Sequence, residues 1–226
     1  MLLTTANGGT TWSSQASGVT QVLYRVACPS SSLCVSVGIT GTIVRSTNGG
    51  ATWTPQVSGT SATLYGLACP SPTLCLAAGT GGTILRSTDG GANWSRVSVP
   101  TTQYFYGLSC ASASNCYAVG GNGTIAASTN GGTSWSLQSS GTGAFLRGVS
   151  CAGSGVCYAV GDTGTILATT NGGAGWLPQS SGTTAGLRDI ACAAGTCVAV
   201  GTSGTILRGA PAGRWSAPAG RNVRLA

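Results

Sequence analysis

A tryptophan returns every 41 residues along this 226-residue chain, and this period constrains the fold more than any other feature. The first member of each of five cysteine pairs keeps the same 41-residue step. A constant period of about 40 residues is typical of a stacked or circular array of similar units. The repeated tryptophans are Trp12, Trp53, Trp94, Trp135 and Trp176.

Each unit consists of four short segments with the length of strands. In the first full unit they are residues 23–28, 33–38, 41–47 and 52–57, and the turn-forming runs PSSS, ITG and NGG separate them. Neither Glu nor Lys occurs in the chain, although exposed helices commonly use both. Four strands in about 40 residues is the size of a propeller blade, so the sequence predicts an all-β propeller of four-stranded blades.

The five full units are predicted to form a single propeller domain over residues 1–226, and both chain ends add further strands. Residues 2–16 match only the third and fourth strands of a unit, and residues 222–226 resemble a first strand. We predict that the two ends jointly form a partial sixth blade; a closed five-bladed ring is the alternative. The full blades are expected at about 23–57, 64–98, 105–139, 146–180 and 187–217.

The stretch STNGGATW, residues 46–53, marks the turn between the third and fourth strands of each unit. Its Asn can accept hydrogen bonds from following backbone N–H groups, and its glycines permit positive φ. Its tryptophan can fill the gap against a neighbouring blade. We therefore predict a structural role for the turn rather than a ligand site. The Asn or Asp of the five turns is Asn7, Asn48, Asp89, Asn130 and Asn171.

Ten cysteines form five close pairs, one in each unit, and each pair brackets the turn between the first and second strands. An even count at this spacing favours five local disulfides, which indicate an oxidising compartment. Free buried thiols are the alternative; a zinc site is disfavoured because the chain has no histidine. The predicted pairs are Cys28/Cys34, Cys69/Cys75, Cys110/Cys116, Cys151/Cys157 and Cys192/Cys197.

The repeated turn resembles the Asp-box, or bacterial neuraminidase repeat, written S-x-D-x-G-x-x-W. Together with the preceding GTI and ST residues, it is similar to the photosystem II stability/assembly factor-like propellers of bacteria. The resemblance implies the fold but no single function, since Asp-box propellers include sialidases, other glycosidases, sorting receptors and scaffolds. The chain departs from the pattern because Asn replaces Asp in four of the five turns.

Catalytic residues are scarce in this composition. A sialidase of this fold would be expected to use a glutamate, and this chain has none. Other glycosidases need paired carboxylates, for which the candidates are Asp162 and Asp189. We expect these two to lie in adjacent blades beside Arg147 and Arg188, where arginines would lower their pKa values. The sequence therefore predicts no enzyme, no cofactor and no metal.

The formal net charge is +7, and all ten cationic side chains are arginine. This balance favours acidic partners such as acidic proteins or anionic glycans. Nucleic acid is disfavoured because there is no arginine-rich run, and no apolar stretch is long enough to span a membrane. The first residues do not resemble a signal peptide, so we expect the chain to be a mature segment or a fragment of an extracellular or cell-surface protein.

One position, four residues before each first cysteine, is the candidate ligand site. In a propeller such equivalent positions form a ring, here near the mouth of the central channel. Aromatic faces can stack on sugars or peptide groups, and arginine can pair with a carboxylate or phosphate. Packing between blades is the alternative role. The residues are Tyr24, Tyr65, Tyr106, Arg147 and Arg188.

The sequence thus predicts a non-catalytic, secreted repeat scaffold that binds a protein or glycan at the channel mouth. The alternative is a structural subunit that assembles into an oligomer or filament through its incomplete terminal blade, which would expose open strand edges. A glycosidase is the third candidate.

Overall fold

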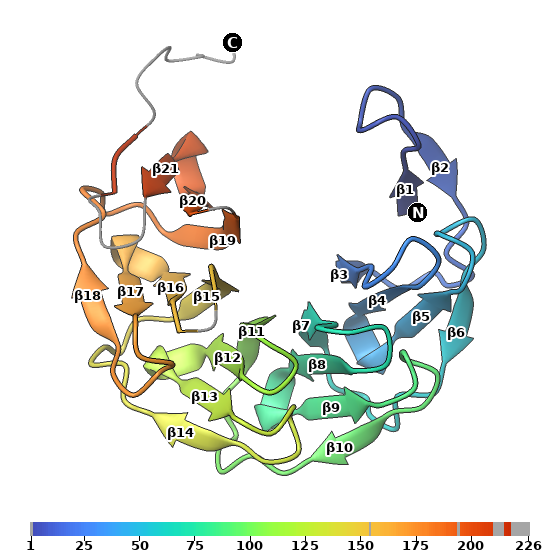
Figure 1. Cartoon of the computed structure of the whole chain (residues 1–226), viewed down its shortest axis with the longest axis horizontal. Coiled ribbons are helices and arrows are strands. Elements are labelled where there is room, and N and C mark those ends of the chain that lie inside the picture. Colours follow the sequence, from blue (N-terminus) through green and yellow to red (C-terminus); the bar gives the residue numbers. More distant parts are fainter. Residues whose placement is uncertain (1, 154, 194, 210–214, 218–226) are drawn as a thin grey trace.

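The computed structural model describes residues 2–153, 155–193, 195–209 and 215–217. Six antiparallel sheets follow one another around an arc, which is open between the last sheet and the first (Figure 1). The predicted all-β propeller of four-stranded blades is confirmed: four sheets have four strands each, and the strands run in sequence order from the inner to the outer edge. The predicted strand at 222–226 lies outside the described residues.

The chain starts with a half-blade, the sheet of β1 (Leu2–Thr4) and β2 (Ser13–Gln15). Blade 1 contains β3 (Leu23–Ala27), β4 (Cys34–Gly38), β5 (Ile43–Ser46) and β6 (Thr54–Gln56). Blade 2 contains β7 (Leu64–Ala68), β8 (Cys75–Gly79), β9 (Ile84–Ser87) and β10 (Ser95–Val97). Blade 3 contains β11 (Phe105–Cys110), β12 (Cys116–Gly120), β13 (Ile125–Ser128) and β14 (Ser136–Gln138).

Blade 4 contains β15 (Leu146–Cys151), β16 (Cys157–Gly161), β17 (Ile166–Thr169) and β18 (Leu177–Gln179). Blade 5 contains three strands, β19 (Leu187–Ala193), β20 (Thr196–Gly201) and β21 (Ile206–Gly209), and a single bridge pairs Arg208 with Ser216. A three-residue 3-10 turn joins the second and third strands of each blade. These turns are η1 (Ile39–Gly41), η2 (Thr80–Gly82), η3 (Gly121–Gly123), η4 (Asp162–Gly164) and η5 (Thr202–Gly204). None of the helices in the described ranges is long and apolar enough to cross a membrane.

The hydrophobic core lies between neighbouring blades. One cluster combines Leu76 and Ile84 of blade 2 with Phe105 and Leu108 of blade 3, and Leu76, Ile84 and Phe105 are fully buried. Equivalent clusters fill the other junctions from blade 1 to blade 5. Each blade therefore buries its apolar faces only against its neighbours, as expected for a repeat array.

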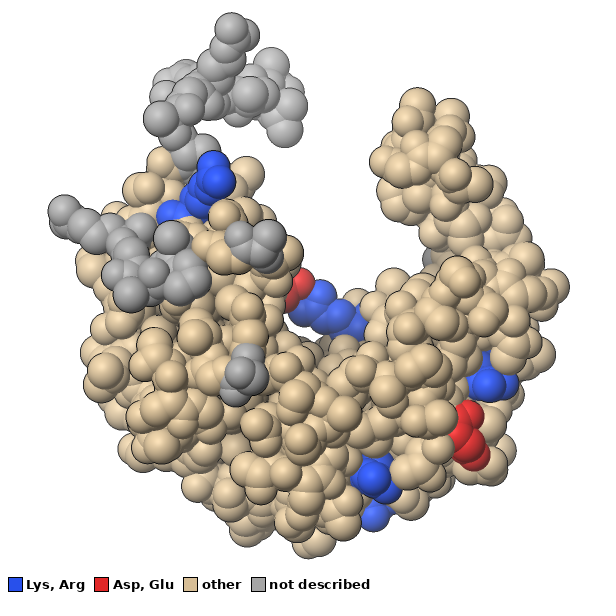
Figure 2. Space-filling model, viewed as in Figure 1, with Lys and Arg blue, Asp and Glu red and all other residues tan. Residues whose placement is uncertain are grey.

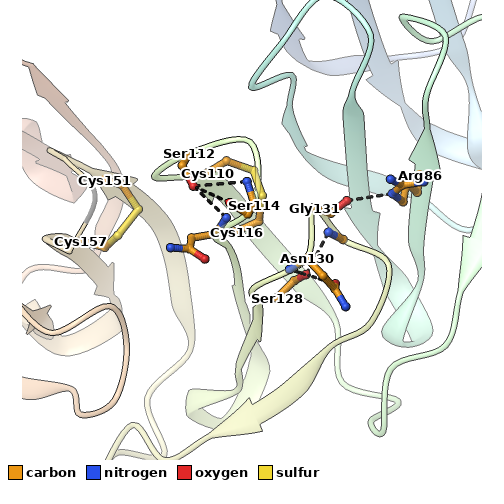
Figure 3. The surroundings of a disulfide bond; sticks show 12 residues. Arg86, Cys110, Ser112, Ser114, Cys116, Ser128, Asn130, Gly131, Cys151 and Cys157 are labelled. Carbon is orange, nitrogen blue, oxygen red and sulfur yellow. Dashed lines mark hydrogen bonds between the residues drawn. A yellow bond between two sulfur atoms is a disulfide. The ribbon is translucent and has the colours of Figure 1, made fainter.

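Local hydrogen bonds fix the Asp-box turn. In blade 3, the Ser128 hydroxyl accepts a bond of 2.9 Å from the Gly132 N–H and donates one of 3.0 Å to Asn130 Oδ1 (Figure 3). Asn130 Oδ1 also accepts from the Ser134 N–H at 2.9 Å. The Trp135 indole N–H donates to the Gly132 carbonyl at 3.2 Å. These bonds use the polar groups of the motif within the turn itself.

The turn also joins one blade to the next. The Arg86 Nε–H on β9 donates to the Gly131 carbonyl in the Asp-box turn of blade 3 at 2.8 Å (Figure 3). Arg45 makes the same 2.8 Å bond to Gly90 at the junction of blades 1 and 2. At the next two junctions the third strand carries Ala127 and Ala168, and buried Tyr117 and Tyr158 pair with them across the sheet. A large residue on the second strand thus compensates for the small one on the third.

All five predicted disulfides are present, and all ten cysteines are paired. In blade 3, Cys110 and Cys116 are directly opposite residues of β11 and β12, with Cα atoms 4.0 Å apart (Figure 3). The bond closes the hairpin between the two inner strands. Because each loop is short, the chain-entropy contribution to stability is about 2 kcal/mol per bond.

The cysteine pair of blade 5 is bonded and brackets its hairpin turn as predicted, but it lies one residue pair further from the turn than in blades 3 and 4. Cys197 is bonded to Cys192 as predicted, but the pair does not directly border the turn, because Cys197 is the second residue of β20 rather than its first. The sequence separation of this pair is 5, against 6 in the other four blades. The shorter loop lets Ala193 and Thr196 also pair across the ladder, so both strands continue past the disulfide. The disulfide predicted between Cys192 and Cys197 is therefore confirmed.

Candidate functional site

The five candidate residues lie on the innermost strands, β3, β7, β11, β15 and β19 (Figure 1). In each of these strands the register to the second strand shifts by one residue, which indicates a β-bulge. The unpaired residue at each shift is the candidate itself: Tyr24, Tyr65, Tyr106, Arg147 or Arg188. Bulges redirect a side chain and often occur beside functional sites. The same bulge in five strands therefore gives the five equivalent side chains the same orientation.

The bulged side chains form one continuous row with Phe145, called here the inner row: Tyr24, Tyr65, Tyr106, Phe145, Arg147 and Arg188. The ring centroids of Tyr24 and Tyr65 are 5.0 Å apart, and those of Tyr65 and Tyr106 are 5.5 Å apart. The Arg147 guanidinium lies 4.7 Å from the Tyr106 ring centroid and 5.2 Å from that of Phe145. These are distances of direct aromatic and cation–π contact. The row has an aromatic half and a cationic half.

Burial also shifts the pKa of a tyrosine in the aromatic half of the row. Desolvation raises the pKa of the Tyr65 hydroxyl, and the neighbouring tyrosines add to the shift. At its ordinary pKa of 10.0 the hydroxyl is already protonated at neutral pH, so the raised pKa leaves it a hydrogen-bond donor. Tyr24 at the end of the row is 46% exposed, so the aromatic surface is accessible.

At the cationic half, two arginines share one carboxylate. Arg147 contacts Asp162 of η4 through two bonds, Nε to Oδ1 at 3.2 Å and Nη2 to Oδ2 at 2.8 Å. Arg188 of the next blade donates to Asp162 Oδ1 at 2.9 Å. The hydrogen bond from Arg147 lowers the pKa of Asp162, as the sequence predicts. Two cations against one anion leave a net positive charge, and the half-exposed Arg188 can donate to a second carboxylate.

Asp189 lies in a different ion pair from the predicted one. It accepts a bond of 2.6 Å from Arg25, which lies 164 residues earlier on β3, across the opening of the arc. The sequence predicts Asp189 beside Arg147 and Arg188 instead. Asp189 follows the bulged Arg188, and its Oδ1 lies 3.0 Å from the position that a Cβ on Gly148 would occupy. Figure 2 displays charged side chains of both signs at the centre of the arc, on a surface that is otherwise largely neutral.

The position that follows the bulge is glycine in the three middle blades. A Cβ added to Gly107 would lie 3.1 Å from Gly148 Cα, and one added to Gly148 would lie 3.0 Å from Asp189 Cα. A side chain at this position in the middle blades would therefore require the neighbouring inner strand to shift by a few tenths of an ångström. Only the two ends of the series carry side chains here, Arg25 and Asp189, and these two pair with each other.

Sequence reasoning missed Phe145 and Arg25. Phe145 precedes the strand rather than occupying the repeated position, and Arg25 pairs with a residue at the far end of the chain. An open hollow of about 750 Å³ is lined by residues 14–21, which include no inner-row residue and no charged side chain, so it is not part of the candidate site.

Comparisons with known proteins support the propeller fold. The family model described as photosynthesis system II assembly factor YCF48 matches residues 58–214. A solved structure of YCF48 bound to D1 peptide is similar at 18% identity and a TM-score of 0.69, with 87% of this chain and 66% of that chain covered. YCF48 from Cyanidioschyzon merolae is similar at 16% identity and a TM-score of 0.72, with 91% and 75% covered.

Enzymes with propeller domains also share the fold. The GH74 xyloglucanase from Xanthomonas campestris is similar at 16% identity and a TM-score of 0.66, with 82% of this chain but only 36% of that chain covered. At these identities the structural matches show the fold alone. No curated protein matches the sequence.

Proposed function

Since this chain belongs to the photosynthesis system II assembly factor YCF48 family, we propose that it is a non-catalytic, secreted scaffold that binds an acidic protein segment along the inner row. The main support for the proposal is the bulge in five successive inner strands. It orients three tyrosines and two arginines along the inner row. The YCF48 structure with a bound D1 peptide favours a protein ligand over a glycan. The five disulfides are consistent with an extracellular or other oxidising location.

The two halves of the row suit different parts of such a ligand. The stacked tyrosines offer flat apolar faces and hydroxyl donors to an extended backbone and its side chains. Arg188 offers a charge-assisted hydrogen bond to a carboxylate, beside the Arg147–Asp162 pair that holds it in place. An anionic glycan would use the same groups, with a sugar ring in place of the peptide on the tyrosines.

Catalysis is disfavoured by the state of Asp162. A general acid at neutral pH needs a raised pKa, whereas the pKa of Asp162 is lowered by Arg147. If a glycosidase activity were measured and Asp162→Asn abolished it, the non-catalytic proposal would be wrong.

The test is binding of ten-residue peptides selected from a random library, measured by calorimetry. We expect acidic peptides to be enriched, and Tyr65→Ala and Arg188→Ala each to weaken binding by about 5- to 30-fold, which corresponds to roughly 1–2 kcal/mol. Arg96→Ala is the matched control, because Arg96 is an exposed arginine on the outer strand β10. Binding that is unchanged in both row variants would exclude the inner row, and selective binding of anionic oligosaccharides would replace the peptide by a glycan.

A second candidate function is a structural subunit that assembles through the terminal half-blade. The observation in its favour is Trp12, which is 59% exposed although its equivalents Trp53 and Trp135 are 9% and 7% exposed.

A further inference from the structure

Blade 5 exposes the face that the other blades bury. Val35, Val37 and Ile43 on the outward face of blade 1 are 0%, 0% and 1% exposed, because blade 2 covers them. Their equivalents in blade 5, Val198, Val200 and Ile206, are 37%, 42% and 49% exposed. These three, together with exposed Arg208, are called here the end face. It is an apolar surface bordered by one cation.

The equivalent face of blade 1, which blade 2 covers, shows what kind of structure packs on such a surface. On blade 1, Val35 and Arg45 are cross-strand partners, and the Asp-box turn of blade 2 lies on both. The Arg45 Nε–H donates to the carbonyl of the first glycine of that turn, Gly90, at 2.8 Å. A Cβ on the second glycine, Gly91, would lie 2.8 Å from Val35 Cγ2, so the turn rests directly on the valine.

The end face repeats this chemistry. Val198 and Arg208 are cross-strand partners on β20 and β21, as Val35 and Arg45 are on β4 and β5. The tyrosine–alanine pairs of blades 3 and 4 are a different solution, and blade 5 does not use it. The end face is therefore of the valine–arginine type, which in blade 1 receives an Asp-box turn.

The half-blade carries an Asp-box turn that nothing in the described structure covers. Gly8 and Gly9 have φ of +67° and +90°, close to the +69° and +85° of Gly90 and Gly91. Asn7 Oδ1 accepts from the Thr11 N–H at 3.0 Å, and the Thr5 hydroxyl accepts from the Gly9 N–H at 2.9 Å. The turn is thus preformed in the conformation that the buried turns adopt.

We propose that the end face of one copy binds the Asp-box turn of the half-blade of a second copy, head to tail. Arg208 then donates to the Gly8 carbonyl, Gly9 rests on Val198, and Trp12 becomes buried at the new junction. This inference rests on the second candidate function, a self-assembling structural subunit, and it identifies the two surfaces through which the copies bind each other. Within one chain the two surfaces stand on opposite sides of the opening (Figure 1), so the complementary turn comes from another molecule. Contact between two different surfaces lets copies add in series or close into a ring.

The test is the mass in solution by light scattering across a dilution series. We expect the mass to rise with concentration above the 22.0 kDa of one chain. Val198→Asp on the end face and Trp12→Ser on the half-blade should each shift this rise to at least about tenfold higher concentration, which corresponds to the loss of a central contact. Val57→Asp is the matched control, since Val57 is 85% exposed and lies on neither surface. Arg208→Glu serves as a second end-face variant if Val198→Asp fails to fold by circular dichroism.

Mixing the two blocked variants tests the direction of the contact. Val198→Asp retains its turn and Trp12→Ser retains its end face, so an equimolar mixture should form pairs and stop there. A wild-type mass of one chain at every concentration would overturn the proposal, and so would growth that both end-face variants leave unchanged. Peptide binding at the inner row should be the same in Val198→Asp and wild type, which separates this proposal from the ligand-binding function.

Discussion

In four of the five Asp-box turns, the side chain four residues after the Asn or Asp forms a hydrogen bond with it, and the fifth turn has Gly175 at this position. Asn48 donates from its amide to the Thr52 hydroxyl at 2.8 Å, and Asn130 donates to the Ser134 hydroxyl at the same distance. In blade 2 the direction is reversed, because Asn93 donates to the Asp89 carboxylate at 2.7 Å. A carboxylate accepts but cannot donate, so it requires a donor such as Asn at this position.

The bonds from Asn93 lower the pKa of Asp89 from its ordinary value of 3.8 to about 2. Since the folded state holds the ionised form more strongly, the carboxylate stabilises the fold above about pH 4, and this contribution is lost as the pH falls toward 2. We expect Asp89→Asn to remove that part of the acid dependence, as measured by urea unfolding at several pH values between about 2 and 5. Its effect at neutral pH should be small because the Asp89 side chain itself is exposed and solvent screens its charge. An identical acid dependence in the variant would contradict the assigned pKa.

At the scale of strands and blades, the 41-residue period predicts the blades, the disulfides and the positions of the inner row, because each depends on contacts within one repeat. The distortions and contacts that build the site were not predictable in the same way. The bulge at Tyr24 has no turn residue or proline to signal it, and the bond from Arg45 to Gly90 joins neighbouring repeats. The Arg25–Asp189 pair depends on how far the arc curves, which is set by the packing of all five blades.

The arginine between blades allows a direct measurement of one junction. Arg45→Ala removes the bond to the Gly90 carbonyl and leaves that acceptor in a buried turn without its donor. We expect a loss of about 1–2 kcal/mol in the free energy of unfolding, since charged donors contribute this much when partly buried. For a chain of this length the melting temperature should fall by roughly 3–6 °C. Exposed Arg96→Ala should change it by less than about 2 °C, and equal melting temperatures for the two variants would mean that the arginine does not secure the junction.

At the scale of the whole molecule, one ion pair spans the opening of the arc. Arg25 and Asp189 are on the first and fifth inner strands, and their side chains are 37% and 41% exposed. A pair this exposed contributes about 0–1 kcal/mol to stability, so it cannot hold the blades themselves together. The pair nevertheless links the first and fifth inner strands. At the equivalent position, the middle blades have a glycine that packs against the backbone of the next inner strand.

The width of the opening should therefore respond to this pair while the stability of the blades does not. We expect Arg25→Gln to increase the radius of gyration measured by small-angle X-ray scattering and to lower the melting temperature by no more than a few degrees. Salt at about 1 M, where the Debye length is about 3 Å, should open the arc of the starting protein in the same way and leave Arg25→Gln unchanged. Both measurements belong in the Val198→Asp background, because assembly would also raise the radius of gyration. Arg96→Gln is the control for charge alone. If Arg25→Gln has the same radius as its parent at low salt, the curvature is set by packing between blades, and the ion pair only follows it.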